Sequence, residues 1–176
     1  MNPFAQTAYF VADDPKHCFL DLDRLYAMAQ SFAEGDLRVP DWRAPVFPED
    51  EKILEFLGVG NSINYCFTEF ATDKKYDVEY PTGSGKIWTG AYGMWAAMRR
   101  AINEGMNLTD NHVLCRLTLD DVAHIFRHVT TPMPMLEERW KNLQNVGYMI
   151  SYWHGSFKKM FERADYKLFN GGNGIV

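Results

Sequence analysis

Apolar positions recur at helical spacing in the stretch from Trp88 to Thr109. Residues three or four positions apart share one face of an α-helix, so a repeat of this kind predicts a helix with a buried face. The apolar members of the repeat are Met94, Trp95, Met98 and Ile102, and polar residues fall largely between them. Gly105 ends the pattern at the position expected for a C-cap. The sequence therefore predicts a core helix near 92–105.

The turn before this helix permits two interpretations. Glycines let a backbone approach a flat ligand closely, and Trp88 and Tyr92 would then form one wall of a pocket for a planar base. The alternative is a glycine-containing turn that leads into a core helix. Aromatic residues at helical spacing usually belong to a core, so composition alone favours the structural interpretation.

The same periodicity predicts further helices near 18–34, 51–70, 119–128 and 135–153, and another that begins at Phe157. Thr118 followed by Asp121 resembles a capping box, which marks a helix start. Trp140, like Trp95, is expected on a buried inner face. The charged residues in the first turn of the helix near 135–153 are expected mostly to face solvent; they are Glu137, Glu138, Arg139 and Lys141.

The period changes to two between Tyr76 and Tyr80, where apolar and acidic residues alternate as in a strand. A turn sequence follows at 81–85, and Ile87 and Trp88 would return as a second strand. We therefore expect one small β-hairpin, with strands only between about 75 and 89. The Gly83–Lys86 sequence resembles part of a phosphate-binding loop but lacks the full motif, so a hairpin turn is preferred.

Asn64 lies within an apolar run that extends from Ile63 to Phe67. A buried amide without partners costs roughly 1–3 kcal/mol, so it must be satisfied. It is either a core amide bound to the protein or an amide that recognises the polar edge of a ligand. The sequence leaves both open.

Composition narrows the functional classes. With 176 residues, 47% of them hydrophobic and 15% aromatic, the chain is long and apolar enough to form one domain with a core. A net charge of -5 disfavours a broad basic surface for stable nucleic-acid binding. The three scattered cysteines indicate a reducing compartment. No apolar run approaches a membrane span, so a soluble, cytoplasmic protein without membrane contact is expected.

His124 and His128 are four positions apart on a predicted helix, a spacing that can hold a metal ion. No third ligand is marked by the sequence, and the acidic residue of a zincin motif is missing. A metal site is therefore not expected.

Three ordered stretches resemble the queuosine salvage proteins, a family of queuosine 5′-phosphate N-glycosylases. They are Gly60–Phe67, Thr89–Thr109 with its Gly-aromatic turn and Ala-Ala-x-x-Arg-Ala helix, and Ile125–Phe157 with its Pro-Met-Leu-Glu-Glu-Arg run. Tyr65 and Thr68 stand where the family has Phe and Trp, which indicates a divergent branch.

The resemblance implies a mainly α-helical fold like that of helical DNA glycosylases, with one small hairpin. The family's chain is about twice as long, and its catalytic Asp lies in a later segment. Residues 1–176 are therefore expected to be the N-terminal part of a single queuosine salvage domain, with the catalytic residue outside this chain. Such a fragment is expected to expose an apolar patch that its C-terminal half would cover.

The implied activity is hydrolysis of queuosine 5′-phosphate to release queuine for tRNA modification, without a metal or organic cofactor. The base side of the pocket is assigned to Asn64, Phe67 and Tyr92, with Trp88 as a weaker candidate. The expected partners are the small-molecule substrate and the missing C-terminal half. The alternatives are a non-catalytic nucleoside-binding module and a purely structural helical module.

Overall fold

The computed structural model describes residues 21–35, 46–48, 52–152 and 155–167. The chain forms two compact units, Met1–Trp42 and Arg43–Val176, which are described separately. In the first unit, helix α2 spans Leu22–Glu34. Asp21 caps it by accepting the Arg24 N–H at 3.0 Å. This confirms most of the helix expected near 18–34, although its apolar residues, expected to form a buried face, are exposed within the unit.

Helix α4 (Gly90–Asn103) is the centre of the second unit, and most of its residues are buried. Helix α3 (Ile53–Asn61) packs against it through aromatic contacts. The Phe56 and Trp95 ring centroids lie 5.3 Å apart. A Cβ atom at Gly60 would lie only 1.8 Å from the Trp95 ring, so the two helices approach closely because residue 60 is glycine.

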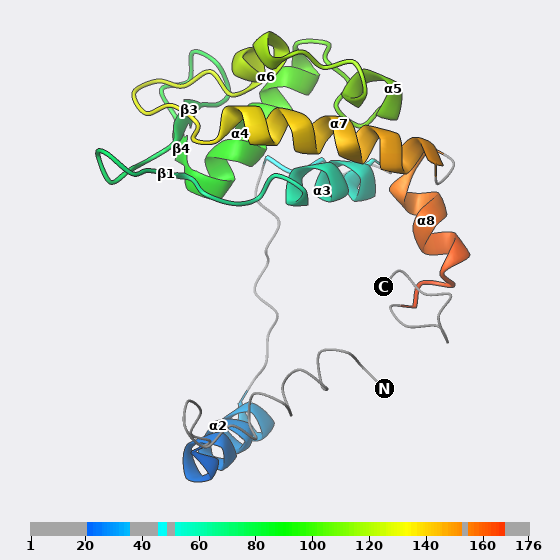
Figure 1. The fold of residues 1–176 in the computed structure, drawn as a ribbon. Coiled ribbons are helices and arrows are strands. Elements are labelled where there is room, and N and C mark those ends of the chain that lie inside the picture. The colour runs from blue at the N-terminus through cyan, green and yellow to red at the C-terminus, as the bar shows by residue number, and fades with distance from the viewer. Residues whose placement is uncertain (1–20, 36–45, 49–51, 153–154, 168–176) are drawn as a thin grey trace. The chain divides into compact units, whose positions relative to one another are not determined.

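Four further helices surround this pair: α5 (Asn111–Leu114), α6 (Leu119–Ile125), α7 (Leu136–Tyr152) and α8 (Phe157–Arg163). Helix α7 packs on α5 and α6, and α8 packs on α3 (Figure 1). The expected capping box is present at the start of α6, where Thr118 and Asp121 bind each other's backbone N–H groups. The prediction of a mainly α-helical class is thus confirmed.

The predicted hairpin is formed by β3 (Asp77–Glu79) and β4 (Ile87–Thr89), with Val78 opposite Trp88. A second antiparallel pair, β1 (Thr68–Glu69) with β2 (Lys74–Lys75), was not predicted. Its first strand, β1, lies in what the sequence suggested was the end of a helix near 51–70. The two-residue strands are too short to show an alternating pattern.

Helix α3 ends at Asn61, so the prediction of a helix to residue 70 was wrong. The segment 62–67 that follows is irregular, and Cys66 has a φ of 46°. Arg139 from α7 holds this segment. Its guanidinium donates hydrogen bonds to the carbonyls of Ile63, Tyr65 and Cys66, the last at 2.6 Å. The carbonyls therefore have a charged donor in place of helical N–H groups.

Two expectations for α7 were also corrected. Arg139 is fully buried, not solvent-facing, whereas Glu137, Glu138 and Lys141 are exposed as expected. Trp95 is buried as predicted, but Trp140 is only partly buried. The Trp140 indole N–H reaches the Leu117 carbonyl at 2.6 Å, and this bond keeps the ring near the surface.

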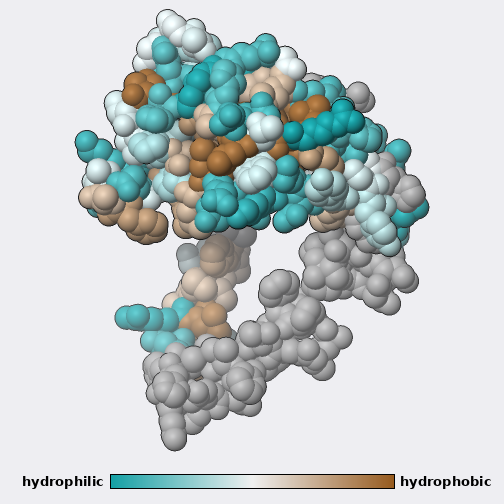
Figure 2. Space-filling view, turned by 45° about the horizontal axis from the view of Figure 1, so that its top comes forward, coloured by the Kyte–Doolittle hydropathy of each residue, from teal (hydrophilic) through white to brown (hydrophobic). Residues whose placement is uncertain are grey.

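Apolar side chains also reach the surface of the second unit. On the face shown in Figure 2, they gather in its middle and are bordered by hydrophilic groups. Exposed apolar and aromatic residues of this unit include Leu54, Phe70, Ile87, Tyr92 and Tyr148. Whether they form the large continuous patch expected of a fragment stays a prediction.

Trp95→Ala should destabilise the second unit by about 3–5 kcal/mol, because it leaves a cavity beside Phe56 and Gly60. Thermal and urea unfolding would measure the loss. Tyr148→Ala, which removes an exposed ring on α7, should change stability by no more than about 0.5 kcal/mol. Equal effects of the two substitutions would contradict the central role of Trp95.

Arg139→Met should cost at least about 3 kcal/mol, because it removes several charge-assisted hydrogen bonds and leaves buried carbonyls without donors. Arg139→Lys keeps the charge but not the planar fork, so it should recover only part of the stability. Arg163→Met on the exposed face of α8 is the matched control. Unfolding free energies from urea titration would rank the three variants, and an Arg139→Met protein as stable as the control would contradict the assignment.

Candidate functional site

The segments that carry the predicted base-side residues lie beside each other because both bind the backbone of Tyr76. The Tyr76 N–H donates to the Phe67 carbonyl at 2.8 Å, and the Tyr76 carbonyl accepts from the Gly90 N–H at 2.9 Å. Phe67 and Gly90 are therefore each hydrogen-bonded to the same residue. Segments more than twenty residues apart in sequence therefore form one surface.

Trp88 and Tyr92 form an aromatic pair on this surface. Their ring centroids are 6.3 Å apart, with an angle of 42° between the planes. The Trp88 indole N–H donates to the Tyr80 carbonyl at 2.8 Å, which fixes the ring on the hairpin. Tyr92 is 48% exposed, so its ring is available for stacking. The structure thus brings together two of the four predicted residues.

Phe67 takes part in a different contact. The Arg139 guanidinium carbon lies 5.2 Å from the centroid of the Phe67 ring and 4.6 Å from that of Tyr65. Burial lowers the pKa of Arg139, an effect opposed by the nearby Tyr65. Burial raises the pKa of Tyr65, while Arg139 acts to lower it. Phe67 is thus a partly buried ring whose position depends on Arg139.

Asn64 is exposed, so the expectation that it is a buried amide was wrong. Its Nδ2 donates to Asn61 Oδ1 at 3.2 Å. The chain leaves the helical path at Ser62, which directs Ile63 into the core and Asn64 to the surface. The exposed Asn64 side chain can still contact a ligand, and the role of Asn64 in binding stays a prediction.

The carboxylates closest in sequence to this surface have structural partners. Asp77 is buried and accepts the N–H groups of Thr130 and Thr131 at 2.9 and 2.8 Å. Burial acts to raise the pKa of Asp77, but these hydrogen bonds outweigh it and lower the pKa below its ordinary value. Glu79 accepts the Gly85 N–H at 2.6 Å. Asp77 is therefore ionised but directed into the protein, and Glu79 helps to form the turn.

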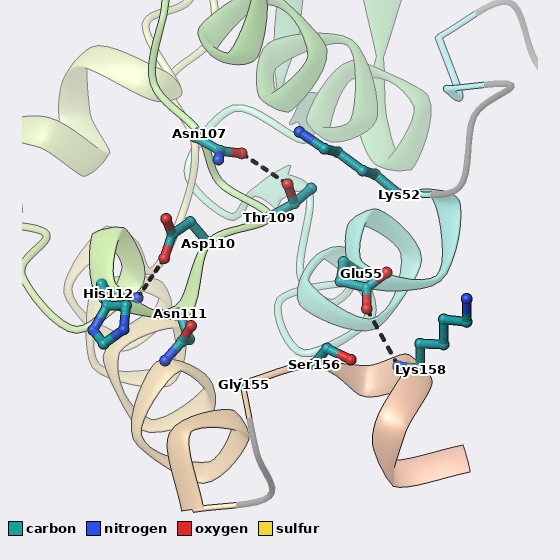
Figure 3. Close-up of a pocket in the computed structure, with 10 residues that line it drawn as sticks. All are labelled: Lys52, Glu55, Asn107, Thr109, Asp110, Asn111, His112, Gly155, Ser156 and Lys158. Carbon is teal, nitrogen blue, oxygen red and sulfur yellow. Dashed lines mark hydrogen bonds between the residues drawn. The ribbon is translucent and has the colours of Figure 1, made fainter. Parts of the chain in front are cut away.

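A separate hollow of about 430 Å³ lies between the start of α3, the loop before α5 and the start of α8 (Figure 3). All its lining residues are polar or glycine: Lys52, Glu55, Asn107, Thr109, Asp110, Asn111, His112, Gly155, Ser156 and Lys158. None of the four predicted residues lines it. Such a lining can donate and accept hydrogen bonds but offers no broad aromatic wall, so the surface around Trp88 suits a planar base better.

The polar hollow was not found from the sequence, since its residues come from three segments that share no pattern. Several of them support neighbouring helices. The Glu55 carboxylate accepts the Lys158 N–H at 3.2 Å, and Asp110 accepts the His112 N–H at 2.8 Å. The only local signals are Asp110 and Ser156, which are common helix-capping residues. These signals predict helix starts and do not indicate a ligand.

Within the described ranges, no cluster of three or more His, Cys, Asp or Glu side chains suits a metal ion. His124 instead lies 3.5 Å from Glu104, which also pairs with Arg127. The hydrogen bond from Arg127 lowers the pKa of Glu104. None of the described helices is long and apolar enough to cross a membrane.

The comparisons with known proteins all point to the same family. The family model for queuosine salvage proteins matches residues 45–168. A Bos taurus protein named queuosine 5′-phosphate N-glycosylase/hydrolase is 29% identical over 170 residues, covering 91% of this chain and 49% of the relative. A protein of the same name from Sphaerobacter thermophilus is 27% identical over 143 residues, covering 80% of this chain and 42% of the relative.

A further relative of that name, from Nematostella vectensis, is 42% identical over 83 residues, covering 46% of this chain and 24% of the relative. The chain spans about half the length of the curated relatives that match most of it. The family match extends from the segment before α3 to the residues after α8, and it includes the surface around Tyr76. Because this match covers most of the chain, the chain belongs to the queuosine salvage protein family.

Proposed function

We propose that this chain is the N-terminal, substrate-holding part of an enzyme that hydrolyses the N-glycosidic bond of queuosine 5′-phosphate and releases queuine for tRNA modification. The observation that carries the proposal is the alignment of 91% of the chain with a protein named for that reaction. The substrate is a small molecule, and we place the enzyme in the cytoplasm.

The proposed reaction breaks the bond between the ribose C1′ and a base nitrogen. The base leaves with the bonding electrons and acquires a proton, while water adds to C1′. The sugar passes through an oxocarbenium-like state, which a nearby carboxylate stabilises or attacks. The enzyme must therefore hold the base, support its departure and place a carboxylate beside the sugar.

The exposed aromatic pair supports a role for this chain in holding the base. Stacking on an aromatic ring is worth roughly 1–3 kcal/mol per base, and Tyr92 has an accessible ring beside Trp88. Phe67 binds the Tyr76 N–H through its backbone carbonyl, and Asn64 precedes it by three residues. The Asn64 amide is accessible and can both donate to and accept from the polar edge of a base.

We place the catalytic carboxylate outside residues 1–176. Asp77 and Glu79, the acids nearest the aromatic pair, are bound to backbone or hydroxyl donors of the protein. Both carboxylates would have to lose these bonds to face a sugar. In the proposed enzyme, the C-terminal half supplies the acid, and the chain described here supplies the base side.

Tyr92→Ala should weaken binding of queuosine 5′-phosphate to the complete enzyme by about five- to tenfold or more, because a stacking contact is lost. Isothermal titration calorimetry would measure binding, and chromatographic detection of free queuine would measure turnover. Tyr148→Ala on α7 removes a comparably exposed ring away from the proposed site, so it should leave both unchanged. Asn64→Ala should also weaken binding, whereas Asn61→Ala removes only its protein partner and should not.

Three outcomes would contradict parts of the proposal. Turnover by residues 1–176 alone would show that the catalytic carboxylate lies within this chain. Unchanged affinity in both Tyr92→Ala and Asn64→Ala would remove these residues from the base side. Binding without turnover, in a complete enzyme given the substrate, would favour a non-catalytic nucleoside-binding module.

A further inference from the structure

Two exposed lysines border the Trp88–Tyr92 pair, and neither has an ion-pair partner among the residues that the structure describes. They are Lys75 on β2 and Lys86 at the start of β4. By contrast, the exposed Lys141 pairs with Glu137 at 2.7 Å, and the exposed Lys167 pairs with Asp165 at 2.6 Å. An ammonium group without a protein counter-ion is available to an anionic ligand.

Lys75, the residue before Tyr76, extends its side chain toward the start of α4. Its Cδ atom lies 3.7 Å from the position that a Cβ atom would take at Gly90. The aliphatic stem therefore lies over the first residue of α4, two positions before Tyr92. Because residue 90 has no side chain, the stem passes close to the backbone there.

Lys86 directly precedes β4, the strand that carries Trp88. Its Nζ atom lies 4.2 Å from the centroid of the Trp88 ring. Exposed cation–π contacts are weak, so the ammonium group can leave the indole for a stronger anionic partner. The flexible stem of lysine permits that movement.

The neighbouring acids bind other partners, and no ion pair joins them to either lysine in the part of the chain that the structure describes. Asp77 is buried, and Glu79 is bound to the Gly85 N–H. Glu69 on β1 accepts the Thr72 N–H at 2.9 Å. Of the acids on these four strands and their turns, Asp73 is the one exposed at the tip of the first pair. The acids keep their charge, but the carboxylates of Asp77, Glu79 and Glu69 are directed toward backbone N–H groups, whereas the two lysines lie beside the aromatic pair.

We propose that Lys75 and Lys86 bind the phosphate of a nucleoside 5′-monophosphate whose base stacks at the Trp88–Tyr92 pair. The inference rests on the proposed function and extends it to the phosphate end of the substrate. A phosphate carries close to two negative charges at neutral pH, and lysine binds it as a point charge. Two ammonium groups beside two rings match a ligand with one anionic end and one planar end.

A mononucleotide fits this surface better than a polynucleotide. Single-stranded nucleic acid is held by a cationic groove that follows several phosphates. In the described ranges, two unpaired lysines border the aromatic pair, and the net charge of the chain is -5. The surface therefore has the charge for one phosphate group.

The test compares ligands with and without the phosphate on the full chain. Calorimetric titrations would use queuosine 5′-phosphate, queuosine nucleoside and guanosine 5′-monophosphate. Lys75→Gln and Lys86→Gln should each weaken binding of queuosine 5′-phosphate by about three- to fivefold, the range for an exposed charge pair. Binding of the nucleoside should change less than about twofold. Lys86→Arg should retain most of the affinity.

Lys158→Gln on α8 is the matched control, since it removes an exposed lysine away from the aromatic pair. Higher salt should weaken binding of queuosine 5′-phosphate more than binding of the nucleoside. This difference in salt dependence should be smaller in the Lys75 and Lys86 variants. Circular dichroism would verify that each variant folds.

The outcomes separate this inference from the proposed function. If queuosine 5′-phosphate binds specifically but both lysine variants match Lys158→Gln, the phosphate site is wrong and the function stands. If guanosine 5′-monophosphate binds equally well with the same lysine dependence, the phosphate site stands and the substrate assignment fails. Absence of nucleotide binding at millimolar concentration, or tighter binding of a single-stranded oligonucleotide, would overturn the phosphate site.

Discussion

The buried guanidinium of Arg139 is the contact on which the arrangement around α4 most depends. A charge in a protein interior must be compensated, because transfer from water is costly. Here the compensation comes from backbone carbonyls of the segment 62–67, from the Pro134 carbonyl at 3.0 Å, and from the faces of the Tyr65 and Phe67 rings. The irregular segment and the charge therefore stabilise each other. Neither would be stable in its position alone.

Arg100 repeats this principle on the other side of α4. It is buried, and its Nη2 donates to the Ile125 and Arg127 carbonyls at 3.2 and 2.9 Å, where α6 ends. Carbonyls at a helix end have no N–H partner within the helix. Arg100 from α4 thus donates hydrogen bonds to carbonyls at the end of α6. Arg139 from α7 does the same for carbonyls of the irregular segment after α3. These contacts hold irregular backbone against regular helices without additional secondary structure.

The hydrophobic periodicity predicted those elements whose structure depends least on contacts with distant residues. The helices α4, α6 and α7 and the hairpin β3–β4 follow from spacing because one face of each is apolar. The helix extended to residue 70 failed because the apolar run Ile63–Phe67 resembles a helix face. Its path depends instead on Arg139, more than seventy residues away. Arg139 was misplaced for the same reason: three other charged residues surround it in sequence, and only the distant carbonyls explain its burial.

Prediction of the candidate site from the sequence was limited in the same way, because contacts between distant segments leave no local pattern. The sequence indicated the Trp88–Tyr92 pair, since both residues belong to one turn and helix start. It did not indicate that Phe67 lies on the neighbouring backbone or that Lys75 lies against Gly90, since both facts depend on the backbone hydrogen bonds that join Tyr76 to Phe67 and Gly90. The polar hollow combines three segments and has no signature in any of them.

The distribution of acids explains why base holding and bond cleavage would be assigned to different halves of the proposed enzyme. A carboxylate that stabilises an oxocarbenium-like sugar must be ionised and must face the ligand. Asp77 meets the first condition through its hydrogen bonds with Thr130 and Thr131, but those same bonds turn it away from the surface. Glu79 and Glu69 likewise hold turns together. Acids that keep this scaffold rigid cannot also move to a sugar, so an aromatic surface with two adjacent lysines suits binding, and the proposed cleavage requires a carboxylate supplied by another segment.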